Sequence, residues 1–498
     1  MKPNCQVTGI RLILGYLGVI LILIGISVLL PLLILIAYPE EIIYAKYFIL
    51  PGVGCLFFGY LLSFLVRNCE KASLNFGQSA SIVTSSWLLA ILASGLPFLI
   101  TGKYNFTQAM FESTSGWSTT GLSVVDVTEA SHIFLLHRSL MLFFGGVGLV
   151  LIMVSVLKDA SGMRLYYAEG HSDKLLPNLI QSSRLILFIY TGYIIIGTVF
   201  YMIFGMNWFD AINHAIAAVA TGGFSTKAES IGYFNSVPIE VVSIVLMFLG
   251  STNFVASLYA FRGKFHNFFR YCELRFTFFL FIFSTILLSF FLWKQQGYPW
   301  MQSLRIAAFQ TTSAFSTTGF QTVPSFAVWS SALALPIILL MIIGGEAGST
   351  SGGVKQFRVW VFLKGIYWSL RDTFFSDKLV RVNYVKKPDT DEVIGSKQRA
   401  EIGSFLFLYI LIMLTGTLII SSYGYPLKEA LFEVSSAMGG VGLSCGITAY
   451  DANPVILWVL MFGMFVGRLE IYVVAVSFIH LLMTPKIAYT KISHKIRR

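Results

Sequence analysis

The chain contains ten long, mostly apolar runs, and this feature limits its possible folds more than any other. A helix needs about 20 apolar residues to cross the hydrocarbon core of a bilayer. The predicted spans are residues 10–37, 46–66, 76–100, 132–157, 180–204, 237–261, 273–293, 327–363, 401–422 and 453–483. A helix satisfies its own backbone hydrogen bonds inside a membrane. The pattern therefore predicts an all-α polytopic membrane protein.

Composition agrees with a membrane location. The 498 residues are 56% hydrophobic and only 12% charged, whereas about 25% of the residues in a soluble domain are charged. The first run, residues 10–37, is longer than the apolar core of a signal peptide, which has about 7–15 residues. We expect it to remain as a transmembrane helix.

Lysine and arginine gather in alternate connections between the spans, and the net charge is +11. The basic clusters are Arg67/Lys71, Lys158/Arg164/Lys174/Arg184, Arg262/Lys264/Arg270/Arg275, Lys364 to Arg399, and a tail that ends at Arg498. By the positive-inside rule, both termini and these loops lie in the cytoplasm. The basic loops are expected to face membrane lipid rather than nucleic acid. The five cysteines have no metal-ligand spacing and are expected to be reduced.

Four shorter segments, rich in Ser, Thr and Gly, lie on the side with few basic residues. They are residues 107–123, 208–225, 302–321 and 427–444. When the segments are aligned on one glycine each (Gly121, Gly223, Gly319 and Gly442), alanine recurs twelve residues earlier and Leu or Phe recurs one residue later. The agreement indicates an internal fourfold repeat.

The repeat continues into the following helices through an M-x-x-G spacing that ends at Gly250, Gly344 and Gly467, with Leu in place of Met before Gly145. Each unit is predicted as helix, short helix, loop and helix. The expected organisation is a two-helix extension at 1–71, then pore repeats at 72–172, 173–266, 267–385 and 386–498. Only the third repeat is expected to have a broken inner helix.

Four non-helical loops inside a membrane are best accommodated around one water-filled axis. The carboxyl end of each short helix would bring partial negative charge toward that axis, which favours cations. Rings of backbone carbonyls replace the hydration shell of K⁺, and glycine permits the backbone turns that point them inward. A single glycine of this kind would indicate only packing, but the fourfold register favours a filter. The predicted K⁺ filter is Thr119, Thr120, Gly121, Thr221, Gly222, Gly223, Thr317, Thr318, Gly319, Gly440, Val441 and Gly442.

A run of small residues interrupts the third inner helix below the predicted filter. The segment lacks the G-x-x-x-x-G-K-[ST] pattern of a phosphate-binding loop. It predicts either a gate or a plain helix kink, and the gate is favoured. The candidate gate residues are Gly344, Gly345, Glu346, Gly348, Ser349, Thr350, Gly352 and Gly353, with Arg468 from the fourth inner helix.

Three charged residues have two interpretations each. Arg468 follows the M-x-x-G glycine of the fourth unit, so it either raises the barrier to cations or pairs with Glu470 or Glu346. Glu112 and Glu433, nine residues before the filter glycines, either attract cations or anchor the short helices. Anchoring is favoured, because His214 and Gln310 occupy the same column.

These motifs resemble the Trk/Ktr/HKT superfamily of K⁺ transporters, and most closely its bacterial TrkH/TrkG-type subunits. The matching motifs are Ser118–Ser123, Thr221–Thr226, Ser316–Phe320, Gly439–Ser444, Gly348–Lys355 and Gly467–Glu470. The resemblance implies K⁺ uptake across the bacterial inner membrane, a homodimer with one pore per subunit, and a gating loop. It also implies control by a cytosolic, NAD- or ATP-binding, TrkA-like subunit. Glycine at all four filter positions favours K⁺ over Na⁺.

A coupled symporter and an enzyme are the alternatives to simple K⁺ uptake. A Na⁺-permeable or a Na⁺- or H⁺-coupled K⁺ symporter of the same fold is the alternative. An enzyme would need a convergent catalytic set, and neither HExxH nor GxSxG occurs. K⁺ is thus expected as the transported ion, with no organic cofactor in this chain.

Overall fold

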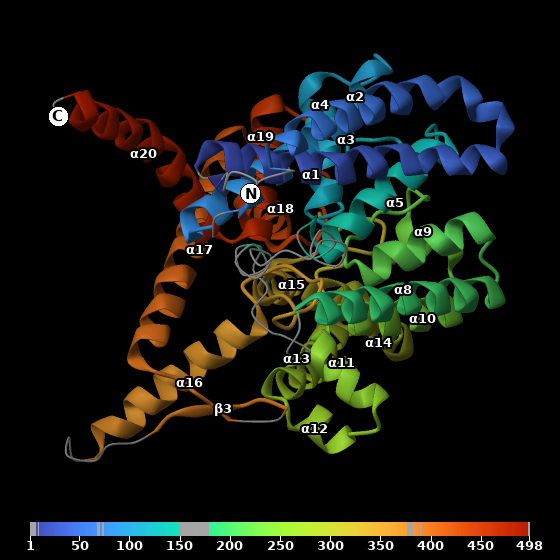
Figure 1. The fold of residues 1–498 in the computed structure, drawn as a ribbon. Coiled ribbons are helices and arrows are strands. Elements are labelled where there is room, and N and C mark those ends of the chain that lie inside the picture. Colours follow the sequence, from blue (N-terminus) through green and yellow to red (C-terminus); the bar gives the residue numbers. More distant parts are fainter. Residues whose placement is uncertain are drawn as a thin grey trace.

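The computed structural model describes residues 6–7, 9–66, 70–71, 74–149, 151, 165, 179–375, 382–388 and 391–496. Almost all described elements are helices (Figure 1). The exceptions are a parallel pair, β1 (Gln6–Val7) with β2 (Glu70–Lys71), and an antiparallel pair, β3 (Tyr384–Lys386) with β4 (Asp391–Val393). The chain is an all-α polytopic membrane protein, as the sequence predicted.

The amino-terminal extension is a helical hairpin. It comprises α1 (Ile10–Leu29), η1 (Leu30–Ile36), η2 (Pro39–Tyr44), α2 (Ala45–Ser63) and η3 (Phe64–Val66). A Cβ added to Gly18 would lie 2.8 Å from the carbonyl oxygen of Gly59, and the reverse substitution would do the same. Small residues therefore allow the two backbones to approach closely, as is common between membrane helices.

The four units follow in the predicted order. The first contains α3 (Phe76–Ile100), α4 (Phe106–Trp117) and α5 (His132–Val147). The second contains α8 (Leu179–Ile203), α9 (Trp208–Val219), η4 (Ser230–Phe234), α10 (Val237–Ser251) and α11 (Phe254–Phe261), followed by α12 (Phe265–Arg270). The third contains α13 (Cys272–Phe291), η5 (Leu292–Gln296), α14 (Trp300–Phe315), α15 (Ser331–Ile343) and α16 (Gln356–Thr373). The fourth contains α17 (Ser396–Ser422), α18 (Leu427–Gly439), α19 (Pro454–Leu469) and α20 (Ile471–Ile496).

Six of the described helices are long and apolar enough to span a membrane, and the number rises to eight if two bent pairs each count as one span. Two shorter apolar helices, α5 and α15, belong to the first and third units. Each of the ten apolar runs contains helix within the described residues, but not all form straight spans. The predicted end of the run 132–157 and the predicted boundary at 172/173 lie outside the described residues, as do Arg67, Lys158, Arg164, Lys174 and Arg498.

The expectation that only the third inner helix is broken was wrong. The predicted continuous helix 237–261 bends by 112° between α10 and α11, and 453–483 bends by 100° between α19 and α20. Asn253 caps α11 by accepting hydrogen bonds from the backbone of Val255 and Ala256, and Glu470 adopts a positive φ of 65°. Hydropathy continues across both sites, so the apolar pattern did not reveal the breaks.

The interrupted third helix was predicted correctly. α15 ends at Ile343, and α16 begins at Gln356. Figure 1 shows α16 and the β3 strand extending away from the helical bundle, with α20 leaving it in another direction. The residues between α15 and α16, 344–355, form the gate loop described below.

Candidate functional site

Each of the four short helices ends in the same backbone arrangement. In every unit, the residue two places before the aligned glycine donates its N–H to the carbonyl of the residue three places before itself. The residue one place before that glycine donates its N–H to the carbonyl of the residue five places before itself. In the first unit these bonds are Thr119 to Gly116 at 3.1 Å and Thr120 to Ser115 at 2.9 Å. In the fourth they are Gly440 to Ala437 at 3.1 Å and Val441 to Ser436 at 2.8 Å. The fourfold repeat is therefore present in three dimensions.

The filter segments also share an alternating backbone. In each segment the aligned glycine and the residue two places before it have positive φ. The values are 54° at Thr119 and 92° at Gly121, 52° at Thr221 and 64° at Gly223, 57° at Thr317 and 84° at Gly319, and 65° at Gly440 and 95° at Gly442. Positive φ is unfavourable for a threonine. Its recurrence in three of the units shows that the surrounding packing imposes it, and such strain is typical of functional sites.

The four segments form a closed ring. A Cβ added to any of the four aligned glycines (Gly121, Gly223, Gly319 and Gly442) would lie closer than 3.0 Å to the carbonyl oxygen of the residue preceding the next of these glycines in the ring. The pairs are Gly121 with Gly222, Gly223 with Thr318, Gly319 with Val441, and Gly442 with Thr120. Each unit thus touches the next and the last touches the first, so the four segments that carry the twelve predicted filter residues form one ring. No side chain larger than hydrogen fits at the glycines.

The first short helix is anchored by a buried ion pair. Glu112 lies nine residues before Gly121 and is fully buried. Its carboxylate accepts hydrogen bonds from the Ser123 hydroxyl at 3.0 Å and the Val124 N–H at 3.1 Å, both just after the filter. Arg138 of α5 donates to it at 2.6 Å and also to the carbonyl of Ser225 in the second unit. This arrangement supports the anchoring interpretation of Glu112.

In the other three units, the residue nine places before the aligned glycine also anchors the short helix, but through different contacts. Glu433 accepts hydrogen bonds from Ser444 at 2.8 Å and from the Cys445 N–H at 3.0 Å. His214 contacts Ser225 at 2.9 Å, and Gln310 donates to Thr322 at 3.1 Å. In every unit the partner therefore lies on the chain that leaves the filter. Sequence analysis identified the column but missed Arg138, whose place within an apolar helix was the available signal.

The gate loop crosses directly beneath the filter. The Gly352 N–H donates to the hydroxyl of Thr317 in the third filter segment at 2.7 Å. The Thr350 hydroxyl lies 2.9 Å from both the Val219 and the Gly250 carbonyl oxygens and shares its one hydrogen between them. A Cβ on Gly352 would collide with the carbonyl of Gly439. The loop is thus in contact with the ends of the short helices and the turn segments of the second, third and fourth units.

Arg468 connects the gate loop with the first unit. Its guanidinium donates to the Thr350 carbonyl at 2.8 Å and to the carbonyls of Gly145 and Gly146 at 2.6 and 3.2 Å. Arg468 thus lies beside the loop between α15 and α16 and at the end of α5. A guanidinium can donate five hydrogen bonds, so one side chain can join several carbonyls.

The two carboxylates expected to pair with Arg468 have other partners. Glu470 forms an ion pair with Arg358 at 2.8 Å. Glu346 is fully buried and accepts hydrogen bonds from the Asn253 N–H at 2.9 Å and the Thr277 hydroxyl at 3.2 Å. The predicted pairing is therefore not supported, and Glu346 instead joins the gate loop to α11 and α13.

A cavity of about 980 Å³ lies on the far side of the gate loop from the filter. Gly348, Ser349, Gly352, Lys355 and Arg468 line it together with residues of α16 and α17. The gate loop and Arg468 thus separate the filter from this cavity.

On the opposite side of the filter, the loop after Gly121 carries an exposed carboxylate, Asp126. The hydroxyl and the backbone N–H of Thr128 donate hydrogen bonds to it and hold its pKa below the usual value. The group is therefore negatively charged at neutral pH, which favours the approach of cations. Among the described residues, no cluster of three or more His, Cys, Asp or Glu could hold a metal ion.

Comparison with known proteins gives a consistent result. The TrkH family, described as cation transport protein, matches residues 45–489. The Trk system potassium uptake protein TrkG of Escherichia coli K12 is 30% identical over 482 residues, which cover 94% of this chain and 98% of that protein. The Trk system potassium uptake protein TrkH of Vibrio parahaemolyticus is 31% identical over 498 residues, which cover 95% and 98%.

The fold is similar to that of a solved transporter. The crystal structure of the potassium transporter TrkH from Vibrio parahaemolyticus superposes with a TM-score of 0.82 at 27% sequence identity. The match covers 94% of this chain and 98% of that chain.

Proposed function

The chain belongs to the TrkH family of cation transport proteins, and from this premise we propose that it carries K⁺ into the cell through the ring of its four filter segments. The family consists of transporters rather than enzymes. The single observation that supports the proposal most strongly is the closed ring, in which each filter glycine lies against a carbonyl of the neighbouring unit. Such a ring offers an ion backbone oxygens in place of its water.

The proposed filter comprises the twelve residues predicted from the sequence. The carbonyls of Thr120, Gly222, Thr318 and Val441 pack against the neighbouring glycines and thereby hold the ring at a fixed width. The relatives named above are potassium uptake proteins, which favours K⁺ as the transported ion. Glycine at all four positions favours K⁺ over Na⁺, as the family resemblance implies.

The proposed gate is the loop from Gly344 to Gly353 together with Arg468. The loop's hydrogen bonds to Thr317, Val219 and Gly250 support a closed position across the conduction path. Arg468 would hold this position through Thr350 and would add a positive charge that slows cations. Opening would require these bonds to break and the loop to move toward the cavity.

The wider setting of the transporter is also a proposal. The relatives are named as proteins of a Trk system, which supports association with other Trk components. We expect a homodimer, a cytosolic TrkA-like subunit that binds NAD or ATP, and a bacterial inner membrane location with both termini in the cytoplasm. The size of the purified complex and cysteine labelling of the termini from each side of the membrane test these expectations.

The decisive test is growth of a bacterial strain that lacks its own K⁺ uptake systems. The wild-type chain is expected to restore growth at low K⁺, with little inhibition by added Na⁺. Gly121→Ser is expected to reduce growth and to increase sensitivity to Na⁺, because a side chain there would collide with the carbonyl of Gly222. If the wild-type chain reaches the membrane and growth is not restored, K⁺ uptake is the wrong function. Uptake that requires a Na⁺ or H⁺ gradient would instead identify a coupled symporter.

A further inference from the structure

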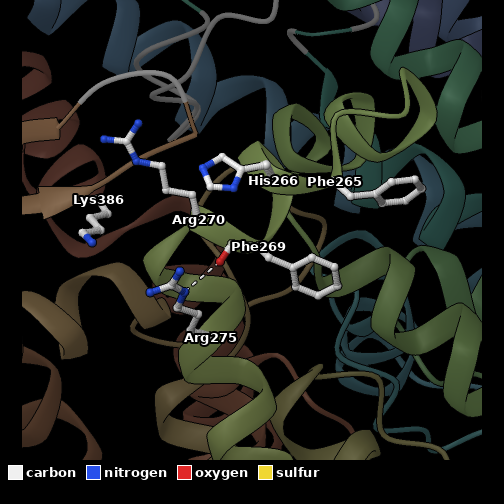
Figure 2. A pocket seen from close by; sticks show the side chains of 6 residues that line it. All are labelled: Phe265, His266, Phe269, Arg270, Arg275 and Lys386. Atoms are coloured by element: carbon white, nitrogen blue, oxygen red, sulfur yellow. Dashed lines mark hydrogen bonds between the residues drawn. The ribbon is translucent and has the colours of Figure 1, made fainter.

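Two adjoining pockets, of about 380 and 450 Å³, lie where α12 and the start of α13 approach the β3–β4 hairpin. Arg270, Arg275 and Lys386 line both of them. Figure 2 shows these three side chains and His266 around the smaller pocket, with the rings of Phe265 and Phe269 on the other side of the view. None of the described residues that line either pocket is acidic. We call the smaller pocket the basic pocket.

The contacts of the basic side chains leave the pocket positively charged. Arg275 donates through Nε to the Phe269 carbonyl at 2.7 Å, as Figure 2 shows, which fixes its position. Arg270 pairs with Asp391 of β4 at 2.9 Å, so its charge is partly balanced. Lys386 of β3 is exposed. Arginine and lysine gathered in this way are typical of phosphate recognition.

An exposed apolar strip begins at the basic pocket. On α13 the residues that follow Arg275 at helical spacing are Phe279, Ile282, Phe283 and Ile286. Their exposed fractions are 58%, 57%, 55% and 56%. Residues three, four and seven apart share one face of a helix. Because α13 is a membrane-spanning candidate, this face is expected to contact lipid chains.

The neighbouring short helix adds an apolar edge to the pocket. Phe265 and Phe269 of α12 are 59% and 52% exposed and lie four residues apart. The chain has bent by 112° between α10 and α11 just before α12, so this segment leaves the direction of the α10 span. Exposed phenylalanines beside basic residues are typical of helices that lie at a membrane surface.

We propose that the basic pocket binds the phosphate of one anionic phospholipid. Arg275 and Lys386 contact the headgroup, Arg270 contributes from its pair with Asp391, and the acyl chains lie along the α13 strip. Phe265 and Phe269 insert at the boundary between headgroup and chains. A soluble phosphate compound would use the charges but not the apolar strip, so the combination identifies a lipid. The larger pocket, which Lys364 and Arg371 also line, can accept a second phosphate of the same lipid.

The test measures lipids retained by the purified full chain in native mass spectrometry, after exchange with phosphatidylglycerol, cardiolipin or phosphatidylcholine. The variant Arg275→Gln/Lys386→Gln removes two charges from the pocket. The control Arg262→Gln/Lys264→Gln removes two charges from exposed positions close to α12 that line neither pocket. Phe279→Gln alters the strip without changing charge. Glycerol phosphate, the headgroup without chains, is the competitor that identifies a soluble ligand.

The wild-type chain is expected to retain an anionic lipid in preference to phosphatidylcholine. Because the pocket variant removes two basic residues that attract an anionic headgroup, it should weaken retention roughly thirtyfold. The control should retain lipid like the wild type, and Phe279→Gln should weaken retention. Equal loss in the pocket variant and the control would overturn the proposal, since it would show a general charge effect. Full displacement by glycerol phosphate, or no effect of Phe279→Gln, would also overturn it.

Discussion

The four filter segments and the four inner helices below them differ in how closely they repeat. The filter segments share the same turn bonds, the same two positive φ values and the same glycine packing in every unit. The inner helices end in three different ways. α5 ends before Gly148, where φ is 91°, α10 and α19 bend by 112° and 100°, and α15 gives way to the gate loop.

The glycines of the inner helices show where the repeat stops. A Cβ on Gly145, Gly250 or Gly467 would collide with the carbonyl at the end of the short helix in its own unit. Gly344, at the same position of the third unit, instead lies against Gly352 and Gly353 of the gate loop. In the proposed mechanism, a ring that coordinates ions requires four similar units, whereas a loop that closes the path needs to come from only one. The repeated features would then serve conduction, and the departures from the repeat would serve gating.

The largest expected effect comes from a substitution within the ring. Gly319→Ala should abolish K⁺ uptake, because the added methyl group would collide with the carbonyl of Val441. Uptake is measured in cells depleted of K⁺. The control is Gly297→Ala, which has a similar positive φ of 71° but no atom within 4 Å of the new Cβ. If both variants lost uptake equally, backbone strain rather than the ring would be responsible.

The next largest effect concerns the anchors of the short helices. Glu112→Gln should lower the free energy of unfolding by about 3–5 kcal/mol, because it leaves the charge of buried Arg138 without its partner. Gln310→Met in the third unit should cost about 1 kcal/mol, since Gln310 donates one neutral hydrogen bond to Thr322. Unfolding in mixed micelles measures both. Similar costs in the two units would show that the ion pair adds nothing to the first unit.

Removal of the positive charge of Arg468, in the fourth unit, should change K⁺ uptake less than the substitution in the ring does. Arg468→Ala is expected to leave K⁺ uptake unchanged or to accelerate it by up to roughly tenfold, since about 1.4 kcal/mol less barrier gives a factor of ten. The reason is the loss of a positive charge and of its bond to Thr350. Flux is measured with purified protein in liposomes. A fully folded variant without flux would contradict the barrier role of Arg468.

The smallest expected effect on K⁺ uptake comes from removal of the Thr350 hydroxyl in the gate loop. Thr350→Val keeps the side-chain shape but removes the donor to Val219 and Gly250. A net loss of about 1 kcal/mol should increase the open fraction roughly fivefold. Thr373→Val, at an exposed threonine that bonds only within α16, is the matched control. A change of equal size in the control would exclude a specific role for Thr350.

Sequence reasoning could identify the repeated turn segments because they depend on a local pattern of residues. The register around Gly121, Gly223, Gly319 and Gly442 was visible in the sequence, and so was the small-residue break after Ile343. The structure adds the order in which the segments contact one another around the ring.

The bends and the buried pairs could not be predicted in the same way. Thr252 and Asn253 interrupt an apolar run only briefly, and their effect depends on the cap that Asn253 provides. Glu346 and Arg468 are close in the repeat alignment, which suggested a pair. Their actual partners, such as Thr277 and Gly145, lie far away in the chain and are brought near only by the fold.

The central claim, that one ring of four unequal segments conducts K⁺, is tested most directly by ion flux into liposomes that contain only the purified chain. With equal inward gradients, K⁺ flux should exceed Na⁺ flux in the wild-type protein, and Gly319→Ala should lose the K⁺ flux while Gly297→Ala retains it. Equal K⁺ and Na⁺ fluxes, or K⁺ flux that persists in Gly319→Ala, would contradict the account.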